Sequence, residues 1–188
     1  GTLDLTTTNP LFEAVISNEL TLGRQNTSTG VGTADGTLVL GSNSVLDVGT
    51  PTARANLNLG WNESNNAASD ATGELNALDG VANLRLNELN IGRSTRGQSA
   101  TGTLLWDQAG AIDATAIYLS RGGGAVGTIE TPAGGTLKLG SATAPVGFLR
   151  MGWNDTTVAG AASGTLDLTT TNPLFEAVIS NELTLGRQ

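Results

Sequence analysis

The 188-residue sequence contains no cysteine and no histidine, and Lys138 is its single lysine. These absences exclude disulfide frameworks, thiol chemistry, Cys/His zinc sites, iron–sulfur and haem ligation, and every catalytic triad that depends on histidine. Only carboxylate, arginine and hydroxyl chemistry is left. For the remaining motifs that could supply such chemistry, a structural interpretation is favoured in each case. We predict no catalytic residues, no cofactor and no metal site, and we expect that the chain is not an enzyme.

Positive charge is scarce and scattered. The sequence has 9 basic and 17 acidic residues, for a net charge of −8, and its cations form no basic stripe that would neutralise phosphates. We expect no nucleic-acid partner. The sequence has no apolar run of about 18 residues that would span a membrane, and no signal peptide. At 38% apolar residues and 14% charged residues, the chain is expected to fold.

A long internal repeat is the strongest feature that is present. The segment Gly1–Gln25 recurs without a change as Gly164–Gln188, at an interval of 163 residues. We interpret residues 1–163 as one full repeat of a tandem array and residues 164–188 as the start of the next. On this interpretation both ends of the sequence are cuts, and export or anchoring signals lie outside it.

A shorter unit subdivides the long repeat. One block has the form G-T-L-x-L and begins near residues 1, 36, 73, 102, 135 and 164, with spacings of 35, 37, 29, 33 and 29. Another block precedes the next start and has the form L-x-L-G-[R/W]. Its five copies within the long repeat are Leu20–Arg24, Leu57–Trp61, Leu89–Arg93, Ile117–Arg121 and Leu149–Trp153. Each unit therefore carries two strand-like blocks.

Both blocks place apolar residues two apart, which is the period of a strand with one buried face. A less regular apolar stretch between them, such as Leu11–Ile16 or Val45–Val48, is expected to form a third strand or strand-like side. Loop lengths vary while the blocks keep their size, which favours a solenoid over a sandwich or a propeller. We predict an all-β parallel β-solenoid (β-helix) of about five coils of 29–37 residues per 163-residue repeat.

Stacking of the coils predicts columns of buried side chains. A single coil cannot be stable alone, and neither end of the sequence shows a cap, so we expect its neighbours to be more of the same chain. One predicted column consists of Leu3, Leu38, Leu75, Leu104, Leu137 and Leu166, and the other of Leu20, Leu57, Leu89, Ile117, Leu149 and Leu183.

The pattern x-L-x-L-G-[R/W]-x(n)-G-T-L-x-L resembles the repeat of autotransporter passenger regions and of PEP-CTERM-associated bacterial surface proteins. The resemblance covers essentially the whole chain. It departs from the pattern at Ala77 and Trp106, in the second apolar place of the first block, and at Ser120, in the glycine place of the second. The resemblance implies a parallel β-helix in a bacterial protein that is extracellular or displayed on the cell surface, and it brings no catalytic residues with it.

Several side chains at the ends of the second block are candidates for surface contacts. An outward column of Trp61, Trp153, Arg24, Arg93 and Arg121 would bind glycans by stacking and bidentate contacts. The alternative is that the arginine stems and indoles cover the corner of each coil, which we favour. Trp106 lies at an inward place and is expected to fill the core.

Other candidate sites carry weaker patterns. Asn26, Asn62 and Asn154 begin N-x-[S/T] sequences in the loop after the second block, where glycosylation is geometrically feasible. Glu13 and Glu19, which recur as Glu176 and Glu182, are the only patterned carboxylates; we favour solvated strand-edge charge over a glycoside-cleaving pair. A threonine-rich ice-binding face would need T-x-T in register on successive coils.

These features predict a structural segment of a long secreted or cell-surface filament, stalk or adhesin shaft. Its expected partners are neighbouring repeats of the same chain or identical chains in a filament. One alternative is an adhesin module in which outward Trp and Arg bind glycans or cell surfaces, and another is a polysaccharide-cleaving β-helix.

Overall fold

A computed structural model describes residues 1–7, 11–26, 31–171 and 173–187. Within these residues all regular structure is β-strand, so the predicted all-β class is confirmed. The strands are β1 (Thr2–Asp4), β2 (Phe12–Ile16), β3 (Glu19–Gln25), β4 (Gly32–Val39), β5 (Ser44–Val48), β6 (Ala55–Asn62), β7 (Ser69–Ala77), β8 (Val81–Ser94), β9 (Ala100–Trp106), β10 (Asp113–Arg121), β11 (Ala125–Glu130), β12 (Thr136–Leu139), β13 (Val146–Trp153), β14 (Ser163–Leu166), β15 (Leu174–Ala177) and β16 (Ile179–Arg187).

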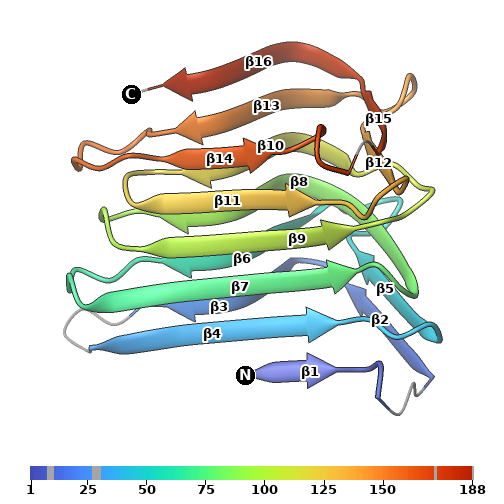
Figure 1. The fold of residues 1–188 in the computed structure, drawn as a ribbon, viewed down its shortest axis with the longest axis horizontal. Coiled ribbons are helices and arrows are strands. Elements are labelled where there is room, and N and C mark those ends of the chain that lie inside the picture. Colours follow the sequence, from blue (N-terminus) through green and yellow to red (C-terminus); the bar gives the residue numbers. More distant parts are fainter. Residues whose placement is uncertain (8–10, 27–30, 172, 188) are drawn as a thin grey trace.

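The strands form stacked parallel ladders. We call the β1-β4-β7-β9-β11-β14 sheet the first sheet and the β3-β6-β8-β10-β13-β16 ladder the second sheet. The third side contains β2, β5 and the start of β8, then β12 and β15, with Ile112 bridging to Leu139. Figure 1 shows β4, β7, β9 and β11 one above another, with β1 at one end of the stack and β16 at the other.

The chain visits the three sides in turn and then returns to the first, one strand further along. We call each such passage a circuit; the first is β1–β3 and the last is β14–β16. The long strand β8 contributes to two sides, because residues 81–84 pair with β5 and residues 86–94 pair with β6. The third side confirms the expected third strand, since β2 and β5 cover the irregular apolar stretches.

The predicted column on the second sheet is confirmed at every position. Leu20 pairs with Leu57 and Leu57 with Leu89; the register then continues through Ile117, Leu149 and Leu183. Leu57, Leu89 and Ile117 in the middle circuits are completely buried. Inward leucines and isoleucines from all three sides meet in one hydrophobic core.

The predicted column on the first sheet is wrong at one position. Ile129 of β11 pairs with Leu104 and Leu166, so Gly127–Ile129 occupies the place expected for the block that begins at Gly135. Leu137 instead lies on β12 of the third side, where it pairs with Phe175. The reason is that Gly127-Thr128-Ile129 is equivalent to G-T-L in shape and polarity, while variable loop length hides the true spacing.

The departures from the repeat pattern are accommodated by local packing. Ala77 pairs directly with Trp106, and both are buried, so the small side chain leaves space for the indole. This position confirms Trp106 as a core residue. Ser120 adopts the positive φ of 69° that glycine has elsewhere in its column, and its hydroxyl donates a hydrogen bond of 2.8 Å to the carbonyl of Ala125.

Glycines line the junction between the first and second sheets. Gly60 has a φ of +67°, and a Cβ placed on it would lie 2.0 Å from the carbonyl oxygen of Thr101. Across the junction, a Cβ on Gly73 of β7 would lie 2.1 Å from the backbone nitrogen of Gly60. The glycine of L-x-L-G and the glycine of G-T-L are therefore both needed because two backbones touch there.

Candidate functional site

The outer surface of the second sheet carries a column of arginine and tryptophan side chains just past the positive-φ corner. Their strands align so that each faces the next along the stack. We call this column the Arg–Trp ladder; in stacking order it consists of Arg24, Trp61, Arg93, Arg121, Trp153 and Arg187. The predicted alignment of these residues is therefore present.

Guanidinium groups lie against both indole rings of the ladder. Trp61 has Arg24 from one neighbouring strand at 4.3 Å and Arg93 from the other at 4.5 Å from its ring centroid. Trp153 has Arg150 at 4.0 Å and Arg187 at 4.4 Å, and it is only 9% exposed. These contacts are within cation–π range and use the ring faces on which a sugar would stack. The geometry matches the corner-covering interpretation of the ladder.

Carboxylates pair with the ladder and balance its positive charge. Arg24 donates to Glu63 at 2.8 Å, and Arg121 donates to Glu88 at 3.0 Å and to Asp155 at 2.8 Å. Burial lowers the pKa of Arg121, but the hydrogen bond that Arg121 donates to Asp155 and the charge of Glu88 outweigh it, so the net shift of the pKa is upward. Burial, and then repulsion from Arg121, lowers the pKa of Arg93.

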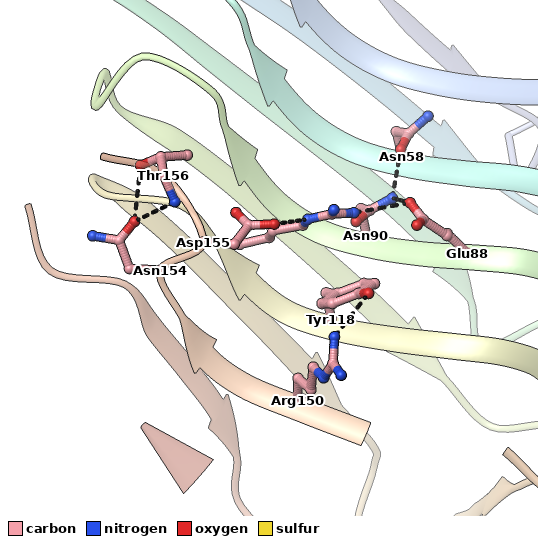
Figure 2. Close-up of polar contacts among 9 residues, drawn as sticks. Asn58, Glu88, Asn90, Tyr118, Arg150, Asn154, Asp155 and Thr156 are labelled. Atoms are coloured by element: carbon pink, nitrogen blue, oxygen red, sulfur yellow. Dashed lines mark hydrogen bonds and ion pairs between the residues drawn. The ribbon is translucent and has the colours of Figure 1, made fainter. Parts of the chain in front are cut away.

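A second outward column lies beside the ladder, three residues earlier on each strand. Asn90 donates to Asn58 at 3.0 Å and to Glu88 at 3.2 Å, and Arg150 donates to the hydroxyl of Tyr118 at 3.3 Å (Figure 2). Asn58 and Asn90 are 1% exposed although they point away from the core. Hydrogen bonds between stacked side chains satisfy the amide of Asn58, which donates to Thr21 and accepts from Asn90, and the amide nitrogen of Asn90. The amide oxygen of Asn90 has no hydrogen-bond partner among the described residues.

Tyr118 and Arg150 were missed as members of this surface. The Tyr118 ring lies 4.4 Å from the guanidinium of Arg121 and 5.7 Å from that of Arg150, so it continues the stacking where the ladder has two adjacent arginines. The signal was present in the sequence, because both residues occupy the middle position of an L-x-L block, where other circuits carry Asn or Thr.

Two of the three predicted glycosylation asparagines are engaged in the structure. Asn62 is fully buried, and its amide nitrogen donates to the carbonyls of Ser69 and Ser99, both at 2.8 Å. A glycan on that nitrogen would require both hydrogen bonds to break, so the geometry argues against glycosylation at Asn62. Asn154 is half-buried and donates to Val158 and Gly160 in its own loop. Asn26 is exposed, while residues 27 and 28 of its sequence motif lie outside the described residues.

The patterned carboxylates are divided between the two ends of the stack. Glu13 and Glu19 lie on β2 and β3 of the first circuit, whereas Glu176 and Glu182 lie on β15 and β16 of the last. Arg150 donates two hydrogen bonds to Glu182, at 3.0 and 3.2 Å, and thereby lowers the pKa of that carboxyl, with Thr184 contributing. Among the described residues, no three acidic side chains are grouped closely enough to hold a metal ion.

Threonines do align on the outer face of the first sheet. Thr103 pairs with Thr128, which pairs with Thr165, and Thr2 pairs with Thr37. Glu74 interrupts this column between Thr37 and Thr103. Only β9 carries T-x-T, at Thr101 and Thr103, so the register that an ice-binding face needs is not continuous across the described strands.

The two ends of the stack expose side chains that are buried in the middle circuits. Leu3 is 48% exposed and Leu183 is 57% exposed, although each belongs to a column whose central members are buried. At the first circuit an opening into the core is lined by Leu3, Phe12, Leu20 and Leu22, among others. The strands of the first and last circuits, β1–β3 and β14–β16, each have one edge that pairs with no other strand among the described residues.

No family model, curated protein or solved structure matches the chain. The described part of the chain has no helix long and apolar enough to cross a membrane.

Proposed function

We propose that the chain is a length of parallel β-solenoid and that its role is structural, as a segment of a secreted or cell-surface filament, stalk or adhesin shaft. The three stacked sides are then the faces of one solenoid, and each circuit is one coil. On this proposal the partners are neighbouring repeats of the same chain or identical chains.

One observation carries the proposal. The two identical 25-residue segments occupy equivalent places in the stack, since Leu3 and Leu166 end the same column of the first sheet and Leu20 and Leu183 end the same column of the second. After five circuits, a residue of the same type therefore stands in the same column, on the same side of the stack. A repeat with this property adds length without changing cross-section.

The outer face of the second sheet agrees with a structural role. Its arginines, aromatic rings and carboxylates contact one another along the stack, and the contacts of Trp61 with Arg24 and Arg93 and the ion pairs of Arg24 and Arg121 join neighbouring circuits. Such contacts stabilise the association of circuits that cannot be stable alone. The resemblance to autotransporter passenger and PEP-CTERM-associated repeats supports placing this filament outside a bacterial cell.

The test is the length of chains that contain one, two and three copies of residues 1–163. Adjacent strands lie about 4.8 Å apart, so five circuits add about 24 Å per copy. Small-angle X-ray scattering is expected to show the maximum dimension rising by about 24 Å per copy while the cross-sectional radius stays constant. A cross-section that grows with copy number would contradict the proposal.

A matched control keeps composition and length the same. In this control the residues that correspond to 164–188 at each junction are scrambled, which removes the in-register circuit between copies. The scattering is then expected to show jointed particles with a broad range of dimensions. If the repeat chains and the scrambled controls gave the same distribution of dimensions, the repeated segment would not be what joins the copies.

A further inference from the structure

The last circuit has the same sequence as the first, so the strands that pair with the first circuit also match the outer edge of the last one. In the first circuit, strands β1, β2 and β3 pair on their inner edge with β4, β5 and β6 of the next circuit. Because residues 164–187 have the same sequence as residues 1–24, β14–β16 present the same residues on their outer edge, where the described chain places no strand. The edge is therefore matched in sequence to residues 32–62.

We propose that residues 164–187 of one copy take the place of residues 1–24 in a second copy, joining the two end to end by exchange of a circuit. The occupant of the open end is thus β4–β6 of the second copy. The proposal rests on the proposed function, and it specifies how separate copies are joined.

The side-chain contacts expected at such a joint already occur within one copy, between the first circuit and the second. Arg24 lies over the ring of Trp61 and donates to Glu63 at 2.8 Å. After exchange Arg187 makes these contacts with the second copy, while it keeps its own Trp153 at 4.4 Å. The Arg–Trp ladder then continues without a break from one copy into the next.

Direct stacking of the two ends, without displacement, brings like charges together. In the same register the last circuit of one copy would lie on the identical first circuit of the other, with each residue opposite its own equivalent. Like charges directly opposite one another destabilise strand pairing. The opposed pairs would be Glu176 with Glu13, Glu182 with Glu19 and Arg187 with Arg24.

Exchange avoids these pairs and preserves the number of paired strands. One set of ladders between β1–β3 and β4–β6 is lost, and a set with the same sequence and register forms in its place. The displaced segment is held along one edge only, and β1 is a three-residue strand whose residues are all exposed. Its release returns conformational freedom to the displaced chain.

Cross-linking between chains of residues 1–188 tests the proposal, because this sequence has no native cysteine. One chain carries Thr165→Cys and an isotopically labelled partner carries Thr37→Cys; the two are mixed in denaturant, refolded together and oxidised. Thr2 pairs with Thr37 within one copy, so its equivalent Thr165 is expected to reach Thr37 of the other copy. Mass spectrometry is expected to identify this disulfide between labelled and unlabelled chains.

Two further pairs make the result decisive. Thr165→Cys with Thr103→Cys is the matched control, because β9 is paired on both edges within its own copy and is unavailable. Thr165→Cys with Thr2→Cys reports direct stacking. Cross-linking of 165 to 2 in place of 165 to 37, or yields for 165 to 37 no higher than the control, would overturn the exchange. Neither result would alter the length per tandem copy, so failure of the exchange is distinct from failure of the proposed function.

Discussion

At the scale of single residues, the corner glycines show a requirement set by distant parts of the chain. Gly60 touches the backbone at Thr101, in a later circuit. The motif L-x-L-G indicated where the glycine lies but not why, because the contact joins segments far apart in the sequence. Ser120 marks the same requirement: it keeps the positive φ and adds a hydrogen bond to Ala125.

Replacing Gly60 with alanine is expected to destabilise the chain strongly. The left-handed conformation alone costs an L-residue about 1–2 kcal/mol, and the new Cβ would lie 2.0 Å from the carbonyl oxygen of Thr101. We expect a total loss of about 2–4 kcal/mol in urea unfolding. Gly110→Ala is the control, because a Cβ at Gly110 has nothing within 4 Å and is expected to change stability by less than about 0.5 kcal/mol. Similar losses for both variants would contradict the role of the corner.

Glu182 is expected to make stability depend on pH in the acidic range. Hydrogen bonds from Arg150 and Thr184 lower its pKa in the folded state below that of the unfolded chain. The stabilisation is therefore complete above the unfolded value of about 4.3 and is lost as the pH falls through the lower folded pKa. Urea unfolding between pH 7 and pH 2 is expected to show a smaller loss of stability for Glu182→Gln than for the wild type. An unchanged pH dependence in this variant would show that the Arg150 pairing does not act through the carboxylate.

At the scale of strands, side-chain period and block spacing were sufficient to predict the second-sheet column from Leu20 to Leu183. They were not sufficient on the first sheet, where Ile129 replaces Leu137. Comparison of residue identities favoured the exact G-T-L that begins at Gly135 over the G-T-I that begins at Gly127. Strand pairing, however, depends on the shape and burial of the side chains. The compensation between Ala77 and Trp106 likewise depends on which residues face each other across circuits.

Replacing a core leucine with alanine is expected to cost more stability in the middle of the stack than at its end. Leu89 is fully buried in the middle, so Leu89→Ala is expected to cost about 2–5 kcal/mol. Leu183 belongs to the same column but is 57% exposed at the end, so Leu183→Ala is expected to cost less than about 1 kcal/mol. Chemical denaturation measures both variants. Equal costs would mean that the two leucines are not at central and terminal positions of one column.

The Arg–Trp ladder is expected to couple neighbouring circuits energetically. A double-mutant cycle with Trp61→Ala and Arg93→Ala is expected to give a coupling of about 0.5–1 kcal/mol, from the cation–π contact at 4.5 Å. The control cycle pairs Trp61→Ala with Arg96→Ala. Arg96 is exposed, three residues further along the chain, and its expected coupling is near zero. Equal coupling in the two cycles would contradict a specific stack.

At the scale of the whole molecule, the fold places one sequence at both ends of a stack. The sequence predicted this arrangement because the 163-residue interval contains a whole number of short units. It predicted the candidate site less completely. The alignment of Arg24, Trp61 and Arg93 follows from block position, but the closure of the indole faces by guanidinium groups depends on side-chain geometry that no spacing encodes. The burial of Asn62 depends in the same way on Ser69 and Ser99, which belong to two different circuits.

The most direct test of this arrangement is the distance between residues 21 and 184, the equivalent positions in the two 25-residue segments. Both lie in one outward column of the second sheet, five strand spacings apart. Double electron–electron resonance between nitroxide labels on Thr21→Cys and Thr184→Cys is expected to give a narrow distribution centred at about 24 Å. A broad distribution, or one centred beyond about 35 Å after allowance for the label tethers, would contradict the in-register stack.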